Sequence, residues 1–181
     1  MGYGTKQIMQ DMRGCQNYQS VYRIENYKER LIFLVNQVER LTGLPEFGKY
    51  MNKLLTIDAI FLNEDRHTHN IAVLMNKDGK FAYCPIFDHG AALLSDITMD
   101  YPMEEDVYAL IDTVRSKTIC DDFDEQLDLS EQLFRCNIKF SFTRKDVDKM
   151  ISQAEHYSEA VKERVKNVLF AQMRKYQYLW I

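Results

Sequence analysis

The hydrophobic positions follow a helical spacing over most of the chain. In residues 25–41, leucines and valines recur every three or four positions with charged residues between them, which predicts an amphipathic helix that ends at Gly43. Pro45 then fits the first turn of a second helix, which continues to residue 62. This second helix is apolar on most sides, so we expect it to be buried; its apolar residues include Leu54, Leu55, Ile57, Ile60 and Phe61.

The spacing changes from helical to alternating in the next segment. Ile71 and Val73, and then Phe81 and Tyr83, flank the turn sequence N-K-D-G. Asp-Gly between two such runs predicts a β-hairpin. Pro85 is expected to end the second strand, because proline cannot donate a ladder hydrogen bond.

Helical spacing returns after the hairpin. Residues 103–119 and 129–138 are expected to form helices. Thr143, with Asp146 three positions later, resembles a capping box and predicts the start of another helix. Ser158 is a suitable N-cap for a final helix that runs toward the C-terminal end of the sequence.

The composition supports a globular, helical fold. Hydrophobic residues make up 46% of the 181 residues, which is enough for a packed core, whereas 7 glycines and 3 prolines are few for a β-sandwich or barrel. We therefore expect a single domain over residues 1–181 that is mainly α with a small β-hairpin (α+β). Residues 1–25 are polar and weakly periodic, so we expect a weakly structured lead-in with at most a short helix.

Charge and cysteine spacing exclude several classes of protein. A net charge of −4 argues against direct nucleic-acid binding, which depends on basic surface. No stretch approaches the run of about 18 apolar residues that spans a membrane, and the N-terminal residues lack the apolar core of a signal peptide. We therefore expect a cytoplasmic protein without a membrane partner. Reduced thiols are expected because no C-x-x-C pair occurs among Cys15, Cys84, Cys120 and Cys136.

Candidate chemistry is concentrated in residues 61–90, which include the sequences NEDRHTHN and PIFDHG. Asp65 and Asn70 are five positions apart, and Asp88 follows the hairpin. In protein kinases the same offset separates the catalytic aspartate from a magnesium-binding asparagine, and a strand pair then leads to a second metal-binding aspartate. Mg²⁺ prefers oxygen ligands, which Asn70 and Asp88 supply, and Asp65 could position an acceptor hydroxyl.

The segment NEDRHTHNIAVL…FAYCPIFDHGAALL, within residues 61–94, resembles the catalytic lobe of HipA-like protein kinases. It is more distantly similar to the D-R-H-x-x-N…D-F-G segment of phosphatidylinositol 3- and 4-kinases. Carried over by position, the resemblance implies that Asp65 is the catalytic aspartate and that Asn70 and Asp88 bind Mg²⁺. It also implies that His67 organises the loop at the cofactor site. The implied activity is phosphoryl transfer from Mg-ATP to a serine or threonine of a protein substrate.

One part of the kinase pattern has no counterpart in this sequence. Kinases grip the nucleotide phosphates with a Gly-rich loop and a strand lysine of an N-terminal lobe. Residues 1–64 are expected to be helical, and G-Y-G at 2–4 followed by Lys6 is not a G-x-G-x-x-G loop. We therefore expect a kinase-like C-lobe without its N-lobe. Its transfer activity alone would be weak or absent, because each lost preorganised donor costs about 10²–10³ in rate.

Two other kinds of function remain open. The chain could be a non-catalytic binding or regulatory module that retains the lobe's fold and contacts a partner, such as a separately encoded N-lobe or an antitoxin-like protein of a toxin–antitoxin pair. Alternatively, His67, His69, Asp88 and His89 could form a metal-dependent hydrolase site, since H-x-H can bind zinc or iron. His156 is the remaining histidine and stands at no recognisable ligand spacing.

Other polar residues in these segments are expected to be structural. Arg66 is expected to pair with an acidic neighbour rather than to react. Asn76 and Asp78 are expected to be turn residues. The acidic residues in 120–128 are expected to form a solvated loop or a helix N-terminus, where negative charge is favourable.

Overall fold

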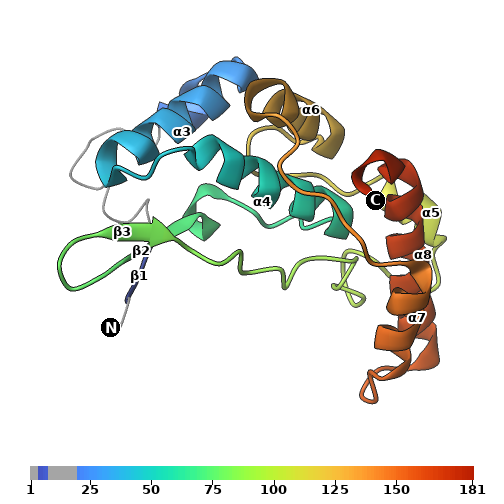
Figure 1. The fold of residues 1–181 in the computed structure, drawn as a ribbon. Helices are drawn as coiled ribbons and strands as arrows, with labels where there is room; N and C mark the ends of the chain where they lie inside the picture. The colour runs from blue at the N-terminus through green and yellow to red at the C-terminus, as the bar shows by residue number, and fades with distance from the viewer. Residues whose placement is uncertain (1–3, 8–19) are drawn as a thin grey trace.

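The computed structural model of the protein describes residues 4–7 and 20–181 (Figure 1). This described part is mainly helical with a small antiparallel sheet, so the expected α+β class is confirmed. Cys15 and most of the expected lead-in lie outside the described residues. The lead-in's expected short helix is α2 (Ser20–Arg23). In the described part of the chain, none of the helices has the length and apolar character needed to cross a membrane.

The two N-terminal amphipathic helices form largely where the hydrophobic spacing places them. Helix α3 (Tyr27–Thr42) begins at the N-cap Asn26, whose side chain accepts the N–H of Glu29, and it ends at Gly43 in the left-handed conformation. Helix α4 (Phe47–Phe61) begins after Pro45, so the expectation that this proline lies in its first turn is wrong. The helix starts later because Glu46 has a left-handed backbone conformation, with φ of 58°, and the Glu39 carboxylate of α3 binds the Phe47 N–H.

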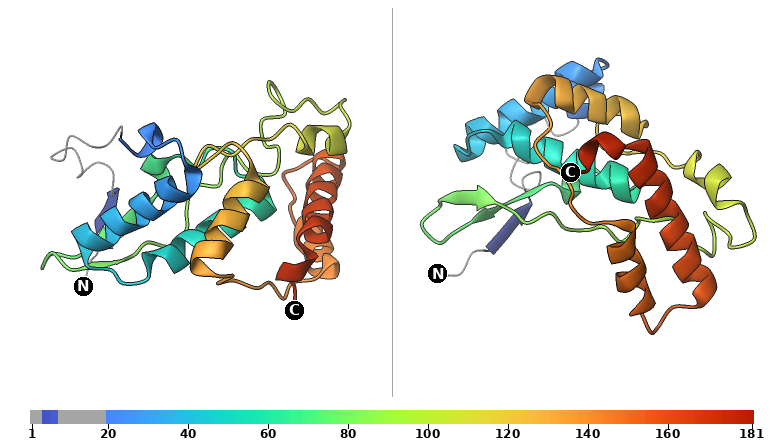
Figure 2. Two further views of the ribbon diagram at one scale, coloured as in Figure 1. Left: turned by 90° about the horizontal axis from the view of Figure 1, so that it is seen from above. Right: turned by 45° about the vertical axis from the view of Figure 1, so that its right-hand side comes forward.

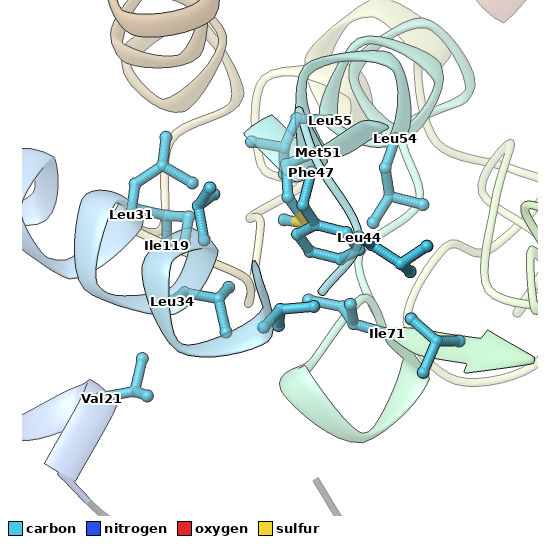
Figure 3. Packing of buried hydrophobic residues seen from close by; sticks show 13 residues of the cluster. Val21, Leu31, Leu34, Leu44, Phe47, Met51, Leu54, Leu55, Ile71 and Ile119 are labelled. Atoms are coloured by element: carbon cyan, nitrogen blue, oxygen red, sulfur yellow. The ribbon is translucent and has the colours of Figure 1, made fainter. Parts of the chain in front are cut away.

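Helix α4 is buried on nearly all sides and is the centre of the fold (Figure 1). It packs against α3, against α6 (Phe123–Phe134) and against α8 (Glu159–Lys175). The N-terminal part of α4 joins α3 in one hydrophobic core, which Figure 3 shows and which includes Leu31, Leu34, Phe47, Met51, Leu55 and Ile119. The C-terminal part of α4 joins α6 and α8 in a second core, which includes Ile60, Leu94, Leu127, Val168 and Leu179.

The predicted hairpin is confirmed. Strands β2 (Ala72–Met75) and β3 (Phe81–Tyr83) pair antiparallel, with Val73 opposite Tyr83. The side chain of Asn76 accepts the N–H groups of Asp78 and Lys80, which closes the turn. Gly79 has a positive φ of 77°, which suits a residue without a Cβ.

A third strand was not expected from the sequence. Strand β1 (Gly4–Gln7) pairs antiparallel with β2 and gives the sheet order β1-β2-β3. The expectation that the lead-in is weakly structured, with at most a short helix, is therefore wrong at residues 4–7. The sequence GTKQ has no alternation of apolar residues, so its pairing is set by the free edge of β2 and not by a pattern of its own.

The expected helix at residues 103–119 is largely wrong. Only α5 (Val107–Ile111) forms there, and it starts where Asp106 caps two backbone N–H groups. The chain then becomes irregular because its polar side chains bind elsewhere: the hydroxyl of Ser116 donates to Gln126, and that of Thr118 donates to the carbonyl of Arg66. Local helical propensity is thus overridden by tertiary hydrogen bonds.

The C-terminal helices follow their capping signals. Helix α6 begins after Asp122, earlier than the expected start at residue 129, and ends at Phe134, so the expected helix at 129–138 is confirmed only in part. The acidic residues 120–128 therefore include a helix N-terminus. The capping box of Thr143 and Asp146 is present and opens α7 (Arg144–Ser152), and Ser158 caps α8 as predicted.

Candidate functional site

The guanidinium of Arg66 joins the two halves of the motif. Arg66 follows α4 and is fully buried. Its Nη1 donates hydrogen bonds to the backbone carbonyls of Asn70, at 3.1 Å, and Phe87, at 2.6 Å. The D-R-H-T-H-N loop and the end of the hairpin therefore meet at one nitrogen atom, although the whole hairpin separates them in sequence.

Asp58, near the end of α4, supplies the negative charge that Arg66 needs. Its Oδ2 accepts Nε of Arg66 at 2.9 Å and its Oδ1 accepts Nη2 at 3.1 Å, with both side chains fully buried. Asn63 donates to the same Oδ1, at 2.8 Å, and to the carbonyl of Asp88, at 3.3 Å. The expectation that Arg66 is structural and pairs with an acidic residue is therefore confirmed, and this network positions the candidate site relative to α4.

The loop from Asp65 to Asn70 is held by its own hydrogen bonds. The carbonyl of Asp65 accepts both the Nδ2 of Asn70 and the N–H of His67, each at 3.0 Å. The carbonyl of His67 accepts the N–H of Asn70 at 2.9 Å, at the start of the 3-10 helix η2 (Thr68–Asn70). His67 thus organises the loop through its backbone. A role of its ring in cofactor binding stays a prediction, and the side chain of His69 lies outside the described part.

Asp88 has a left-handed backbone conformation, with φ of 62°, and an exposed side chain. This conformation costs an L-residue about 1–2 kcal/mol, although aspartate tolerates it better than most residues do. The hydrogen bond from Asn63 to the Asp88 carbonyl helps to hold it. Strained residues of this kind are concentrated at functional sites, but Leu62, Leu93 and Leu94 also have a positive φ, so the backbone of Asp88 marks no function by itself.

His89 lies against the Arg66–Asp58 pair. Its Nε2 is 3.2 Å from Nη2 of Arg66 and 3.7 Å from Oδ1 of Asp58. Because a guanidinium can only donate, Nε2 acts as the acceptor and the ring is neutral. Burial lowers the pKa of His89, and the nearby Arg66 charge lowers it further against the opposing effects of Asp58 and Asp88.

The arrangement of His89 does not favour the hydrolase hypothesis. Its Nε2 already accepts a hydrogen bond from Arg66 and is therefore not available to a metal ion. Among the residues that the structure describes, no group of three or more histidine, cysteine, aspartate or glutamate side chains is arranged to hold a metal. The cysteines of this part, Cys84, Cys120 and Cys136, are free thiols.

The oxygen atoms of the motif suit a hard cation. The Nδ2 of Asn70 donates to the Asp65 carbonyl, which leaves the Oδ1 of the amide to coordinate a cation. The carboxylates of Asp65 and Asp88 form no hydrogen bond or ion pair with any residue of the described part. Carboxylate and amide oxygens are the donors that Mg²⁺ takes, usually together with water and phosphate oxygens. The donor set at Asn70 and Asp88 therefore fits the implied magnesium ion.

Two residues that matter most to this site were missed by sequence reasoning. Asp58 and Asn63 are both fully buried and bind Arg66, Asp88 or each other. Asp58 did carry a usable signal, because it is the one acidic residue in the apolar helix sequence LLTIDAIFL. A buried carboxylate needs a cationic partner, and Arg66 is the next arginine along the chain.

Comparison with known proteins assigns the chain to no family. No protein-family model matches it, and searches of curated proteins and of solved structures give no significant match.

Proposed function

We propose that the chain is a HipA-like catalytic lobe that binds Mg-ATP and supports phosphoryl transfer to a serine or threonine of a protein. In this proposal Asn70 and Asp88 hold the magnesium ion, and Asp65 positions the acceptor hydroxyl. His67 shapes the loop between them. The observation that carries the proposal is the contact of Arg66 with the carbonyls of Asn70 and Phe87, because it brings both motif halves to one place.

The chemistry of these residues agrees with their proposed roles. Magnesium would neutralise the negative charge of the nucleotide phosphates when it is bound. Asp65 is half-buried and its carboxylate has no partner in the described part, so it is available to accept the proton of an acceptor hydroxyl. The buried Arg66–Asp58 pair binds the two backbone segments through Arg66, which favours the preorganised arrangement that catalysis requires.

Efficient transfer also needs positive groups that grip the nucleotide phosphates. We assign these groups to an N-lobe that lies outside residues 1–181. On this basis the chain alone is expected to bind Mg-ATP and to transfer phosphate slowly or not at all. A purely regulatory module would also bind a partner, but it would not need the charges of Asp65 and Asp88.

The test is the thermal stability of the purified chain with Mg-ATP, compared with ATP in the presence of a chelator. A ligand at ten times its Kd stabilises the folded state by about 1.4 kcal/mol, which corresponds to a rise in Tm of roughly 3–6 °C for a chain of this size. We expect this rise with Mg-ATP and expect Asp88→Ala to abolish it. Absence of any shift at millimolar Mg-ATP would contradict the proposal.

Two further variants separate the roles. Asp128→Ala removes the same charge from an exposed position on α6 and should leave the Mg-ATP shift intact. Asp65→Asn should also keep the shift, because Asp65 is assigned to the acceptor and not to the metal. It should abolish any transfer of radiolabelled phosphate to a serine-containing protein. Loss of the Mg-ATP shift in Asp65→Asn would indicate that Asp65 is a metal ligand.

A further inference from the structure

A mainly apolar cavity of about 410 Å³ opens directly beside the end of the motif. One wall is formed by residues 89–97, which begin one residue after Asp88, and includes Leu93 and Ile97. The opposite wall is formed by the end of α7, the turn after it and α8, and includes Ile151 and Val161. Figure 2 shows the chain after the hairpin running from the sheet across to α7 and α8. The cavity is large enough for one large apolar side chain.

The walls of this cavity are held in place by buried hydrogen bonds. Arg164 of α8, which lines the cavity and is 5% exposed, donates to the carbonyls of Tyr101, at 2.5 Å, and Pro102, at 2.6 Å. The hydroxyl of Tyr101 donates in turn to the carboxylate of Glu64, at 2.8 Å, next to Asp65. The cavity is therefore preformed, and its wall is tied to the loop that carries the proposed catalytic aspartate.

The mouth of the cavity is unusually apolar for a surface. Ile97 and Tyr157 line the cavity and still expose 37% and 62% of their surface. Met99 stands two positions after Ile97 and is 80% exposed, and Met150 stands next to the lining residue Ile151 and is 72% exposed. Exposed apolar residues grouped around a cavity are typical of a site that binds another molecule, and methionine suits surfaces that adapt to a partner.

The charge around the cavity restricts what that molecule can be. Residues 91–114 contain six acidic residues and no lysine, arginine or histidine. Asp100, Glu104 and Glu105 are exposed, and none of them forms an ion pair within the described part of the chain. The facing wall carries two cations: Lys162 is paired with Glu159 at 2.9 Å, and Arg164 is buried against the carbonyls of Tyr101 and Pro102. Because Arg164 of the cavity wall binds the carbonyls of Tyr101 and Pro102, this acidic segment lies beside the cavity. Negative charge there repels nucleic acid and anionic lipid and attracts a cationic partner.

We propose that this cavity binds an apolar side chain of the acceptor polypeptide, whose flanking residues are lysines or arginines. The inference rests on the proposed function, because it identifies the substrate class of the same site. His89 is part of the cavity wall and follows Asp88, so a polypeptide anchored there passes the proposed phosphoryl-transfer site. The apolar side chain fills the cavity, and the flanking cations meet Asp100, Glu104 and Glu105.

The test is fluorescence anisotropy with a short labelled peptide that carries one serine, an adjacent leucine and lysines on both sides. Replacing the leucine by asparagine should weaken binding about tenfold or more, as expected for the loss of one buried apolar side chain. Replacing the lysines by glutamates should abolish binding. Equal affinity for the leucine and asparagine peptides would overturn the proposal, and so would binding of the glutamate peptide.

Variants of the protein locate the binding. Ala154→Phe places a ring at the half-buried mouth of the cavity. It should weaken binding of the leucine peptide about tenfold and have little effect on binding of the asparagine peptide. Glu104→Lys/Glu105→Lys should weaken binding and reduce its salt dependence. Glu25→Lys/Asp128→Lys makes the same charge change at exposed positions elsewhere and should leave both the binding and its salt dependence unchanged. Equal effects of the two charge-reversal variants would overturn the assignment to this rim.

Peptide binding is measured without nucleotide or magnesium, so it can fail independently of the proposed function. If Mg-ATP stabilises the chain and the peptides do not bind, the substrate inference is wrong and the nucleotide site stands. If the leucine peptide binds selectively and Mg-ATP has no effect, the cavity is a peptide site and the phosphoryl-transfer proposal is wrong.

Discussion

Asp58 and Arg66 form a doubly hydrogen-bonded ion pair in which neither side chain is exposed to solvent. The pair connects the central helix α4 to the loop that carries Asp65. Through the further hydrogen bonds of Arg66 to Asn70 and Phe87, it also holds the end of the hairpin. The arrangement of the candidate site therefore depends on two residues that have no proposed chemical role.

Asp58→Asn should strongly destabilise the fold. It leaves the guanidinium of Arg66 buried without its counter-charge, and breaking one partner of a buried pair typically costs about 3–5 kcal/mol. The measurement is the free energy of unfolding in urea. Glu163→Gln, which removes one partner of an exposed pair with Lys166, is the control and should have little effect. Similar losses in both variants would contradict a structural role for the buried pair.

His89 should make the stability of the protein decrease as pH falls. Its pKa is lower in the folded state than the value of about 6.5 in the unfolded chain, chiefly because of burial and then Arg66. The unfolded chain therefore takes up the proton first, so stability is fully present above about pH 6.5 and is lost as pH falls through the lowered folded pKa. Protonation also turns the hydrogen-bond acceptor at Arg66 into a donor.

The measurement is Tm as a function of pH for the native protein and two variants. His89→Gln should show a smaller decrease in Tm between about pH 7.5 and pH 5.5 than the native protein shows. His156→Gln, at an exposed position, should follow the native curve. If the Tm of His89→Gln decreases with pH as much as that of the native protein, groups other than His89 cause the decrease.

Local signals in the sequence predicted much of the fold. The hairpin, the Gly43 helix end and the Thr143–Asp146 capping box each depend on residues close together in the chain. The failures are long-range. Strand β1 exists because β2 offers an edge, and the helix expected at 103–119 breaks because Ser116 and Thr118 bind distant groups. No periodicity within these segments could reveal such partners.

The same limit applies to the candidate site. The spacing of Asp65, Asn70 and Asp88 could be found in the sequence, because a loop and a hairpin are local structures. The sequence indicated that Arg66 would pair with an acidic residue, but it did not reveal which residues Arg66 contacts. The left-handed conformation of Asp88 also has no sequence signal, since glycine would be the expected residue there.

Gly48→Ala should destabilise the protein, although alanine is the better helix former. A Cβ at Gly48 would overlap the ring of Phe134, at a separation closer than real contacts allow. The propensity gain of about 1 kcal/mol is therefore outweighed by overpacking between α4 and α6, which costs about 1–3 kcal/mol and sometimes more. Adding Phe134→Leu should recover part of the loss in a double-mutant cycle. Simple additivity of the two changes would contradict this close contact.

Asp88→Gly should separate the backbone of Asp88 from its carboxylate. Glycine adopts a φ of 62° without strain, whereas alanine does not, so Asp88→Gly should be more stable to urea than Asp88→Ala by about 1 kcal/mol. Both variants lack the carboxylate and should lose the Mg-ATP shift equally. Equal stability of the two variants would show that the conformation imposes no strain. A Mg-ATP shift retained in Asp88→Gly would exclude the carboxylate as a metal ligand, because in that variant the backbone is intact and only the charge and its oxygens are gone.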